Sequence, residues 1–562
     1  MDSKTETIEF DGRKIVARHG ESLAASLTAA GVKSFRTTAG GVDRGMFCGM
    51  GVCQDCLVEV DGRPNQRACM TKVSGPHVVR AEAHGRPLPP VSDYRPPATI
   101  QDIRVESPEV LVIGAGPGGL SAAIAARRAG AEVVVLDERS QPGGQYFKQP
   151  DVRGEDIAAP DAQHREGADL IETARSLGVT IRSGVTVWGA FAPLEFAASG
   201  PNGTVRYHPK AAVVATGAYE RGWPVPGWTL PGVMTTGAAQ TLWRTARRSP
   251  GKRVLIAGNG PLNLQLASEL IDAGSDVVAV IEAAKQPGIG NFSTVLSMLS
   301  ASPSLVRNGI VYHWKRMRAG TGMVHGEVVR KVEKSGDGLK VTTGPADGSG
   351  SVRTFEVDTL CLGYGFEPAN ELLRGLGCHH DFDPVRRQLV TRRDASGQTS
   401  VSGLYALGDC TGLGGARAAL AEGTLVGTAA AKSLGKIVQT DIAKASADLA
   451  RHRRFQSVLW QLYAFSGYHA SLADRETLVC RCEEVSFGQI EDALSEDLTM
   501  IGAVKRQTRV GMGRCQGRYC APVLDTLMAA RLGYERDEYS GFAPRVPIRP
   551  VRIEDLAGGG QP

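Results

Sequence analysis

Eight of the eleven cysteines fall into two sets whose spacing could hold iron and sulfide. The first set has the spacing C-x4-C-x2-C-x12-C and comprises Cys48, Cys53, Cys56 and Cys69. This is the plant-type [2Fe–2S] spacing, whereas structural zinc favours C-x2-C pairs. Glycines at 45, 49 and 51 would let backbone N–H groups turn toward cluster sulfurs. The first set therefore predicts a [2Fe–2S] cluster, with structural zinc as the alternative.

The second set lies near the end of the chain and combines C-x-C with C-x4-C. Its members are Cys480, Cys482, Cys515 and Cys520. Five basic residues lie among them: Arg481, Lys505, Arg509, Arg514 and Arg518. Such cations would offset the negative charge of four thiolates and iron sulfide. The pattern is similar to the bacterioferritin-associated-ferredoxin-like (BFD-like) [2Fe–2S] module, and a zinc site is again the alternative.

A dinucleotide-binding pattern begins at Glu109. The apolar run Val110–Ile113 precedes glycines at G-x-G-x-x-G spacing, an Ala-rich helix is expected over 120–129, and a second strand ends at Asp137. The glycines are Gly114, Gly116 and Gly119. They permit a tight turn, close approach of a pyrophosphate and packing of helix on strand, while the acid is placed to hold an adenosine ribose. The stretch ends at Gln145, which we include among the expected cofactor contacts.

Two later stretches resemble motifs of the two-dinucleotide-domain flavoproteins. VVATGAYE (213–220) is expected to be a strand that ends in Thr216 and Gly217, and it resembles the ATG motif of that superfamily. GLYALGDCTGLGGARAALAEG (403–423) resembles the second FAD fingerprint of the glutathione-reductase-like superfamily. The resemblance implies that Gly408 and Asp409 lie at the flavin, with the acid hydrogen-bonded to the ribityl or pyrophosphate part of FAD.

The dinucleotide pattern returns, altered, at residues 253–282. Gly258 and Gly260 keep the first two glycine positions, Asn263 replaces the third, and Glu282 ends the second strand. We expect the bulk of Asn263 to push the helix from the strand or to reshape the phosphate pocket. No arginine directly follows Glu282 to meet a 2′-phosphate, so this fold suits NAD or another adenine nucleotide rather than NADP. A domain kept for packing alone is the alternative.

Composition excludes several other classes of function. The chain has 562 residues, 42% of them hydrophobic, and a net charge of +5 without long basic runs, so nothing favours nucleic acid. No apolar run approaches the ~18–20 residues of a transmembrane segment. The charged N-terminus MDSKTETIEF lacks the apolar core of a secretory signal. We expect a cytoplasmic protein without disulfides, with peripheral contact at the inner membrane left open.

These patterns predict an α/β two-dinucleotide-domain flavoprotein with an iron–sulfur domain at each end. The expected order is a β-grasp [2Fe–2S] domain (1–84), a Pro-rich linker (85–108), the first half of the FAD domain (109–250), an inserted NAD- or adenine-nucleotide-type domain (251–345), the second half of the FAD domain (346–435), a helical connector (436–475), a BFD-like [2Fe–2S] domain (476–530) and an extended tail (531–562).

Taken end to end, the chain resembles the large α subunit of hetero-oligomeric flavin-dependent amine dehydrogenases, a family that includes opine oxidase, hydrogen cyanide synthase, D-hydroxyproline and L-proline dehydrogenases and heterotetrameric sarcosine oxidase. Motifs such as GNGPLNLQLA and GMGRCQGRYC carry the resemblance. Relatives often have the N-terminal module as a separate subunit or lack some of its cysteines, whereas all four cysteines are present here.

The resemblance implies an electron-transfer role. An amino-acid-oxidase-like β subunit with its own FAD would oxidise a small amine, and electrons would pass through this chain to a downstream acceptor. An FMN at the subunit interface is left open. We identify no catalytic acid, base or nucleophile in this chain. An NAD(P)H-dependent FAD/[2Fe–2S] oxidoreductase that acts on its own is the main alternative, and a redox-inactive scaffold subunit is disfavoured by the eight spaced cysteines.

Overall fold

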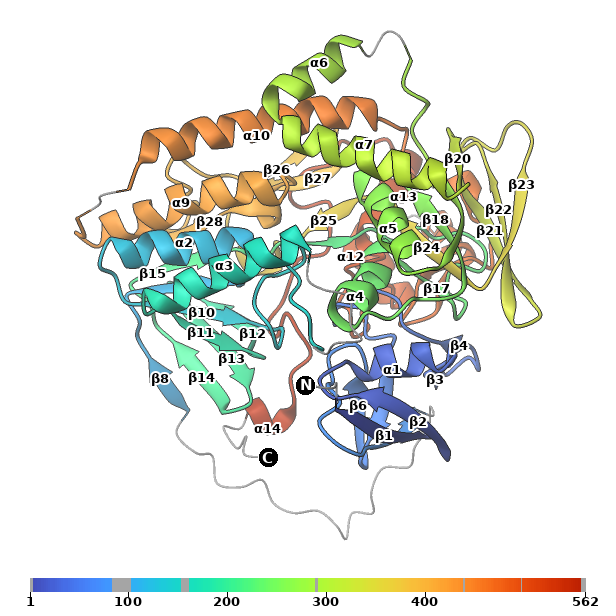
Figure 1. Cartoon of the computed structure of the whole chain (residues 1–562), viewed down its shortest axis with the longest axis horizontal. Coiled ribbons are helices and arrows are strands. Elements are labelled where there is room, and N and C mark those ends of the chain that lie inside the picture. The colour runs from blue at the N-terminus through green and yellow to red at the C-terminus, as the bar shows by residue number, and fades with distance from the viewer. Residues whose placement is uncertain are drawn as a thin grey trace.

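The structure is a computed structural model that describes residues 4–82, 103–152, 161–288, 292–437, 440–496 and 498–556 (Figure 1). The N-terminal module is a five-stranded sheet of order β2-β1-β7-β5-β6. Its main elements are β1 (Thr5–Phe10), β2 (Arg13–Arg18), α1 (Leu23–Ala29), β5 (Leu57–Val60), β6 (Arg63–Arg67) and β7 (Val78–Ala81), with a small ribbon of β3 (Arg36–Thr37) and β4 (Asp43–Arg44). The helix α1 begins after Ser22, whose hydroxyl caps it by accepting from the Ala25 amide.

The FAD-type domain is built on a parallel sheet of order β11-β10-β9-β15-β28. The strands are β9 (Val110–Ile113), β10 (Val133–Asp137), β11 (Thr180–Ser183), β15 (Ala211–Val214) and β28 (Leu404–Ala406). Every residue of β9, β10 and β15 is buried, as expected for a parallel sheet covered on both faces. Figure 1 shows three helices together on one side of this sheet: α2 (Pro117–Arg128), α3 (Ala162–Ser176) and α9 (Ala416–Ser433). The other side carries β12 (Thr186–Phe191), β13 (Glu195–Gly200) and β14 (Gly203–Tyr207), with β8 (Arg104–Glu106) at the edge.

The inserted domain has its own parallel sheet, of order β17-β24-β18-β19-β20. Its strands are β17 (Val233–Thr235), β18 (Arg253–Gly258), β19 (Asp276–Glu282), β20 (Gly322–His325) and β24 (Thr359–Gly363). Its helices are α4 (Thr236–Ala246), α5 (Pro261–Asp272), α6 (Phe292–Ala301) and α7 (Pro303–Arg318), and an antiparallel sheet follows with β21 (Val328–Ser335), β22 (Gly338–Gly344) and β23 (Arg353–Val357).

Two predicted boundaries differ from this arrangement. Strands β17 and β24 pair within the inserted sheet although they lie outside the predicted range 251–345. Glycines in the sequence indicate where loops lie. The boundary between the two domains depends instead on which strands pair, and β17 and β18 pair with β24, more than 100 residues away. The strand predicted to end in Thr216 and Gly217 ends earlier, at Val214 in β15, and β16 (Ala218–Glu220) then pairs with β25 (Phe366–Pro368) in a ribbon between the domains.

The remaining elements of the FAD half are short. They are α8 (Glu371–Gly375), β26 (His380–Asp383), β27 (Gln388–Thr391) and the 3₁₀ turn η3 (Gly408–Thr411). The predicted helical connector 436–475 is helical only in α10 (Ile442–Leu462) and the single turn η4 (Ala470–Leu472). Most of the predicted linker 85–108 lies outside the described residues.

The C-terminal module consists of a hairpin and small helices. They are β29 (Leu478–Cys480), β30 (Val485–Ser486), α11 (Phe487–Ser495), α12 (Ile501–Thr508) and α13 (Ala521–Leu532). The tail then returns to the FAD-type domain, where the Ile548 amide donates to the Trp188 carbonyl at 2.8 Å, and it ends in α14 (Ile553–Leu556). Of the helices in the described ranges, none has the length and apolar character needed to cross a membrane.

Candidate functional site

A cavity of about 1100 Å³ lies where the FAD-type domain, the inserted domain and both cysteine-bearing modules meet. Its walls include every residue that the sequence assigned to the first nucleotide fold and the FAD fingerprints: Gly114, Gly116, Gly119, Asp137, Gln145, Thr216, Gly217, Gly408 and Asp409. Cys48 and Met50 of the N-terminal cysteine loop also line it. The three residues assigned to the second fold, Gly258, Gly260 and Glu282, are not among the lining residues. One cavity therefore joins the flavin motifs to the first cysteine set.

The first glycine turn has the shape that a pyrophosphate requires. Gly114 has φ +110°, and a Cβ there would collide with the Ala215 carbonyl, while a Cβ at Gly119 would collide with the Gly114 carbonyl. At Gly116, by contrast, the nearest atom to an added Cβ is the Gly144 Cα at 3.9 Å. The turn is thus tight on the protein side and open on the cavity side, at the N-terminus of α2. This geometry fits the phosphates of a dinucleotide such as FAD.

Asp137 is part of the turn itself. One carboxylate oxygen accepts from the Ala115 amide at 2.6 Å and the other from the Arg139 amide at 2.8 Å. Burial raises the pKa of Asp137 to about 6, against the lowering effect of these amides. Each oxygen already has a backbone donor, so the acid holds the glycine turn in place as well as facing the cavity.

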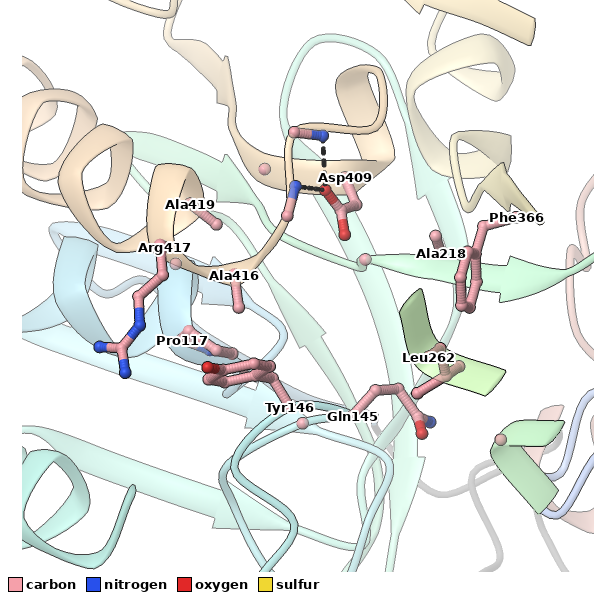
Figure 2. Close-up of a pocket in the computed structure, with 18 of the residues that line it drawn as sticks. Pro117, Gln145, Tyr146, Ala218, Leu262, Phe366, Asp409, Ala416, Arg417 and Ala419 are labelled. Carbon is pink, nitrogen blue, oxygen red and sulfur yellow. Dashed lines mark hydrogen bonds between the residues drawn. The ribbon is translucent and has the colours of Figure 1, made fainter. Parts of the chain in front are cut away.

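Asp409 leaves one oxygen free for a ligand. Its Oδ1 accepts from the Gly414 and Gly415 amides at 2.9 and 2.8 Å, and Figure 2 shows the second oxygen pointing into the cavity. Burial raises the pKa of this carboxyl. A carboxylate fixed at the end of a strand and aimed at bound ligand fits the hydroxyls of a ribityl chain, as the fingerprint implies. Gln145, Tyr146 and Arg417 border the same space in Figure 2.

Two buried titratable residues in the cavity wall, Lys148 and Glu220, have no role assigned from the sequence, although Glu220 ends the stretch VVATGAYE. The Lys148 ammonium donates to Gln240 Oε1 at 2.8 Å, and burial lowers its pKa to about 7. The Glu220 carboxylate accepts from the Gly237 amide at 2.9 and 3.0 Å, and burial raises its pKa to about 7. Groups with pKa values near neutrality are suited to giving and taking protons at neutral pH. Both side chains therefore lie buried in the cavity wall with pKa values shifted toward neutrality.

The tail also contributes to the cavity. Ile548 and Arg549 line it, and the Arg549 guanidinium lies 3.7 Å from Glu138. Burial would raise the pKa of Glu138, but Arg549 and neighbouring arginines hold it below its ordinary value. Sequence reasoning missed this contact because nothing in the tail shows which surface it covers.

The second glycine turn is held by hydrogen bonds from its own residues. The Glu282 carboxylate accepts from the Gly260 and Ala284 amides at 3.0 and 2.9 Å and from Asn259 Nδ2 at 2.9 Å. Asn259 Nδ2 also donates to the Tyr463 carbonyl at 2.9 Å, so the end of α10 lies against the turn. Burial raises the pKa of Glu282. The acid that would hold a ribose here already has partners within the protein, although a Cβ at Gly260 would meet no atom within 4 Å.

Asn263 does not push the helix from the strand as the sequence suggested. Its side chain accepts from Thr236 Oγ1 at 2.8 Å and donates to the Gly363 carbonyl at 3.2 Å. A Cβ at Gly363 would collide with the Asn263 side chain. The Asn263 side chain thus fits because the neighbouring strand β24 has a glycine, Gly363, opposite it.

The first cysteine set is buried and surrounded by backbone donors. The Cys53 amide donates to Cys48 Sγ at 3.3 Å, and the Asp55 amide donates to Cys53 Sγ at 3.5 Å. Burial alone would raise the pKa of Cys48, but hydrogen bonds from the Cys53 thiol and from nearby amides lower it to about 6. A buried Tyr519 hydroxyl has no hydrogen-bond partner among the described residues. Amides aimed at sulfur and an unpaired hydroxyl nearby fit a [2Fe–2S] cluster held by Cys48, Cys53, Cys56 and Cys69.

The second cysteine set brings its thiols into contact. Cys482 Sγ lies 3.9 Å from Cys480 Sγ and 3.7 Å from Cys515 Sγ. Hydrogen bonds from the thiols of Cys482 and Cys520 lower the pKa of Cys480 to about 3. Within the described ranges, no three His, Cys, Asp or Glu side chains are arranged to hold one metal ion. The contacting thiols at 480, 482, 515 and 520 fit a cluster with more than one iron.

The basic residues around the second set are less uniform than predicted. All five have partners other than the cysteines: Arg481 pairs with Asp55, Arg509 with Glu483, Arg514 with Glu82, Arg518 with Glu371, and Lys505 lies over the Phe542 ring. Arg481 is buried between two of the cysteines. The sequence could count these cations but not the acids that neutralise them.

Family comparisons match each part of this arrangement. Residues 108–423 match the pyridine nucleotide-disulphide oxidoreductase family, residues 3–84 a 2Fe-2S iron-sulfur cluster binding domain, and residues 478–530 a BFD-like [2Fe-2S] binding domain. The predicted FAD-type fold flanked by two [2Fe–2S] domains is thereby confirmed.

Whole-chain relatives are equally consistent. The opine oxidase A subunit of Agrobacterium tumefaciens is 34% identical over 80% of this chain and 91% of its own length. The hydrogen cyanide synthase protein HcnB of Pseudomonas aeruginosa is 30% identical over 78% of this chain and 96% of its own. The crystal structure of L-proline dehydrogenase from P. horikoshii shares the fold, with a TM-score of 0.72 and 20% identity over 99% of this chain and 98% of that one.

Proposed function

The chain belongs to the family of opine oxidase A subunits and hydrogen cyanide synthase B subunits, and from that membership we propose that it is the flavin- and iron–sulfur-containing electron-transfer subunit of a hetero-oligomeric amine or amino-acid dehydrogenase. One observation carries the proposal: residues of both FAD fingerprints and Cys48 of the first cysteine set line the same cavity. A cofactor in the cavity would thus lie beside a cluster ligand, with no need for a mobile carrier between them.

The partner in this proposal is an amino-acid-oxidase-like subunit with its own FAD, and it binds the small amine substrate. Its opine- or proline-type substrate gives up electrons that reach this chain and then a downstream acceptor. An FMN at the subunit interface and a cytoplasmic location, with peripheral contact to a membrane, complete the proposal. FAD, when bound, supplies the step between two-electron and one-electron chemistry.

This chain's own residues bind and position the cofactors. Gly116 and the amides at the N-terminus of α2 would bind the phosphates. Asp409 would orient the sugar chain. Lys148 and Glu220 give or take protons at Nζ and at the carboxylate, because their pKa values of about 7 allow both forms at neutral pH. The cysteines hold the iron. We assign no residue of this chain to attack on the amine.

An NAD(P)H-dependent oxidoreductase is the alternative. The hydrogen bonds within the second glycine turn disfavour it. A nicotinamide must stack on the flavin to deliver hydride, which requires its phosphates to be held in the inserted domain. Glu282, Asn259 and Tyr463 already satisfy one another at that turn.

Metal content is a direct test of the cluster assignment. Anaerobically purified chain is expected to contain about four iron and four sulfide, since two [2Fe–2S] sites are proposed. Cys53→Ser should remove one cluster and leave the other, whereas Cys378→Ser, a buried cysteine outside both sets, should remove neither. Stoichiometric zinc without iron–sulfur absorbance would refute the electron-transfer proposal.

Electron entry tests the proposal as a whole. The chain is mixed anaerobically with the partner flavoprotein and with an opine, a proline derivative or glycine, and flavin bleaching is followed by stopped flow. Rapid bleaching that needs both partner and amine supports the dehydrogenase. Rapid bleaching of the isolated chain by NADH alone would replace it with the oxidoreductase.

A further inference from the structure

The two cysteine sets pack directly against each other although they come from opposite ends of the chain. One continuous group of buried side chains contains Cys48 and Cys53 of the first set and Cys515 of the second, with Cys482 packed against it. Phe47 precedes Cys48 and Tyr519 precedes Cys520, and their rings lie 5.3 Å apart, edge to face. Aromatic residues adjacent to ligands of both sets are therefore in contact, without a layer of the flavin domain between them.

Arg481 lies at the centre of this contact. It stands between Cys480 and Cys482, and its guanidinium carbon lies 3.8 Å from the centre of the Phe47 ring and 4.7 Å from that of Trp228. Its Nε lies 2.7 Å from Asp55 Oδ2, and its Nη1 donates to the Trp228 carbonyl at 2.9 Å. Asp55 lies in the sequence between Cys53 and Cys56, two cysteines of the first set. One arginine of the second module thus binds an acid in the first, 426 positions away.

Both members of this ion pair are cut off from water. The side chain of Arg481 is 5% exposed and that of Asp55 is 0% exposed. Arg36 gives Asp55 a second, longer contact at 3.5 Å. A parallel link joins the same modules, where the fully buried Arg44 lies 3.1 Å from Glu484 and the Gly40 amide donates to Glu484 at 3.0 Å. With the longer pair of Arg514 and Glu82 at 3.8 Å, three ion pairs among the described residues join the two modules, each with one partner from either side.

A buried ion pair is expensive to form and seldom gains net stability over apolar packing. Its position gives a different reason for its presence. Each set of four thiolates with iron and sulfide carries net negative charge, and a nearby charge acts strongly where water is excluded. A cation on Arg481 is close to ligands of both sets, and an anion on Asp55 opposes it. The pair can therefore act on two redox sites at once.

We propose that Arg481 and Asp55 form an electrostatic bridge that couples the two [2Fe–2S] sites and supports direct electron transfer between them. The step moves one electron from the reduced site to the oxidised site, with no bond made or broken and no proton transferred. Arg481 is a positioning residue in this scheme, because it touches the ligand segments and not the reacting amine. The inference rests on the proposed function only in that both cysteine sets carry clusters.

The test measures both midpoint potentials by dithionite titration of the full chain, followed by electron paramagnetic resonance. Arg481→Met removes the cation and should lower the potentials of both clusters, since the added electron loses a favourable charge. Asp55→Asn removes the anion and should raise both. Arg481→Lys restores a cation and should bring both potentials back toward the wild-type values. Neither partner nor amine is present, so failure of the dehydrogenase proposal leaves this readout unaffected.

Arg475→Met is the matched control, because it removes the same charge beside the C-terminal module, at a side chain that is 60% exposed and paired with Asp492. It should leave both potentials unchanged. Shifts confined to the cluster nearest the substitution, or equal shifts in the control, would overturn the bridge. If Arg481→Met fails to retain both clusters, Asp55→Asn decides alone: opposite or absent shifts at the two clusters refute the proposal, and a rise in both potentials supports it.

Discussion

The two dinucleotide folds of this chain have the same elements but present their glycine turns to different surroundings. The first, β9–α2–β10, opens its turn to the cavity, where the space beside Gly116 is free. The second, β18–α5–β19, packs its turn against the end of α10, where Asn259 donates to the Tyr463 carbonyl, although Pro261 and Leu262 at the start of α5 also line the cavity. Both helices begin with proline after the second glycine, at Pro117 and Pro261. The fold alone therefore does not identify a nucleotide site, and the surroundings of the turn decide.

The acids at the ends of β10 and β19 make the same point. Asp137 and Glu282 occupy equivalent positions, and each accepts hydrogen bonds from the amides of its own turn. The sequence pattern predicts a ribose ligand at this position, but in both folds the acid first organises the backbone. Its presence therefore indicates a well-formed turn more directly than it indicates a bound nucleotide.

Substitution of the second glycine should separate the two folds most strongly. Gly116→Val fills the open side of the first turn and is expected to weaken flavin binding about 1000-fold, or roughly 4 kcal/mol. Gly260→Ala in the second turn is the matched variant; its φ of +112° makes the change costly for stability, but flavin content should persist. Flavin absorbance per chain after gel filtration is the measurement. Equal flavin content in Gly116→Val and wild type would show that the first turn does not hold the cofactor.

The pH dependence of stability should report on the first acid. Because burial raises the pKa of Asp137 from 3.8 to about 6, the unfolded state loses its proton first as pH rises. The contribution is fully present below about pH 4 and is lost by about pH 6, a change of roughly 3 kcal/mol. Asp137→Asn should remove this slope when denaturant unfolding is compared across about pH 4–7. Glu282→Gln should remove a further decline of the same sign, and a slope that persists in Asp137→Asn would contradict the assignment.

Reduction by nicotinamide tests the second turn in the wild-type chain. NADH and NADPH should bleach the flavin at least about 100-fold more slowly than amine plus partner, equivalent to roughly 2.7 kcal/mol of barrier. The physical reason is that Glu282, the acid expected to hold the ribose, is already hydrogen-bonded to the Gly260 and Ala284 amides. Stopped-flow traces with each donor provide the comparison, and similar rates would mean that the second turn opens.

The smallest effect is expected from restoring the third glycine. Asn263→Gly gives the second turn the full G-x-G-x-x-G pattern but removes hydrogen bonds to Thr236 and Gly363. Stability should fall by about 1–2 kcal/mol, measured from thermal unfolding, with no gain in NADH reactivity. Asn308→Gly, at an exposed position in α7, controls for the helix propensity of glycine. A gain in NADH reactivity would make Asn263 itself, and not the closed surroundings, the barrier.

Local sequence patterns predicted the strands and turns of the first fold well. The apolar run 110–113 is β9, and the run that ends at Asp137 is β10. Such elements depend on neighbours in sequence, so glycine, proline and hydrophobic runs reveal them. The membership of β17 and β24 in the inserted sheet depends on pairing between distant segments, which no local pattern records.

The residues of the candidate site also fall into those that local motifs predicted and those that only the fold reveals. Glycines and acids in motifs could be assigned to a flavin site in advance, and they line the cavity. Lys148 and Glu220 could not, because a single buried Lys or Glu has no signature until the cavity around it is known. Phe47 and Tyr519 had a weak signal, since each directly precedes a cysteine of a spaced set, but only the fold brings their rings together.

The tail has a consequence for the order of biosynthesis. Ile548 is buried in the core of the FAD-type domain, and Arg549 completes a wall of the cavity. Chains fold from the N-terminus during synthesis, at ≈ 5–20 residues per second. The ribosome has therefore made both cysteine-bearing modules before the wall that encloses the flavin motifs can close. The complete wall around the flavin motifs can therefore form only after residue 549 has left the ribosome.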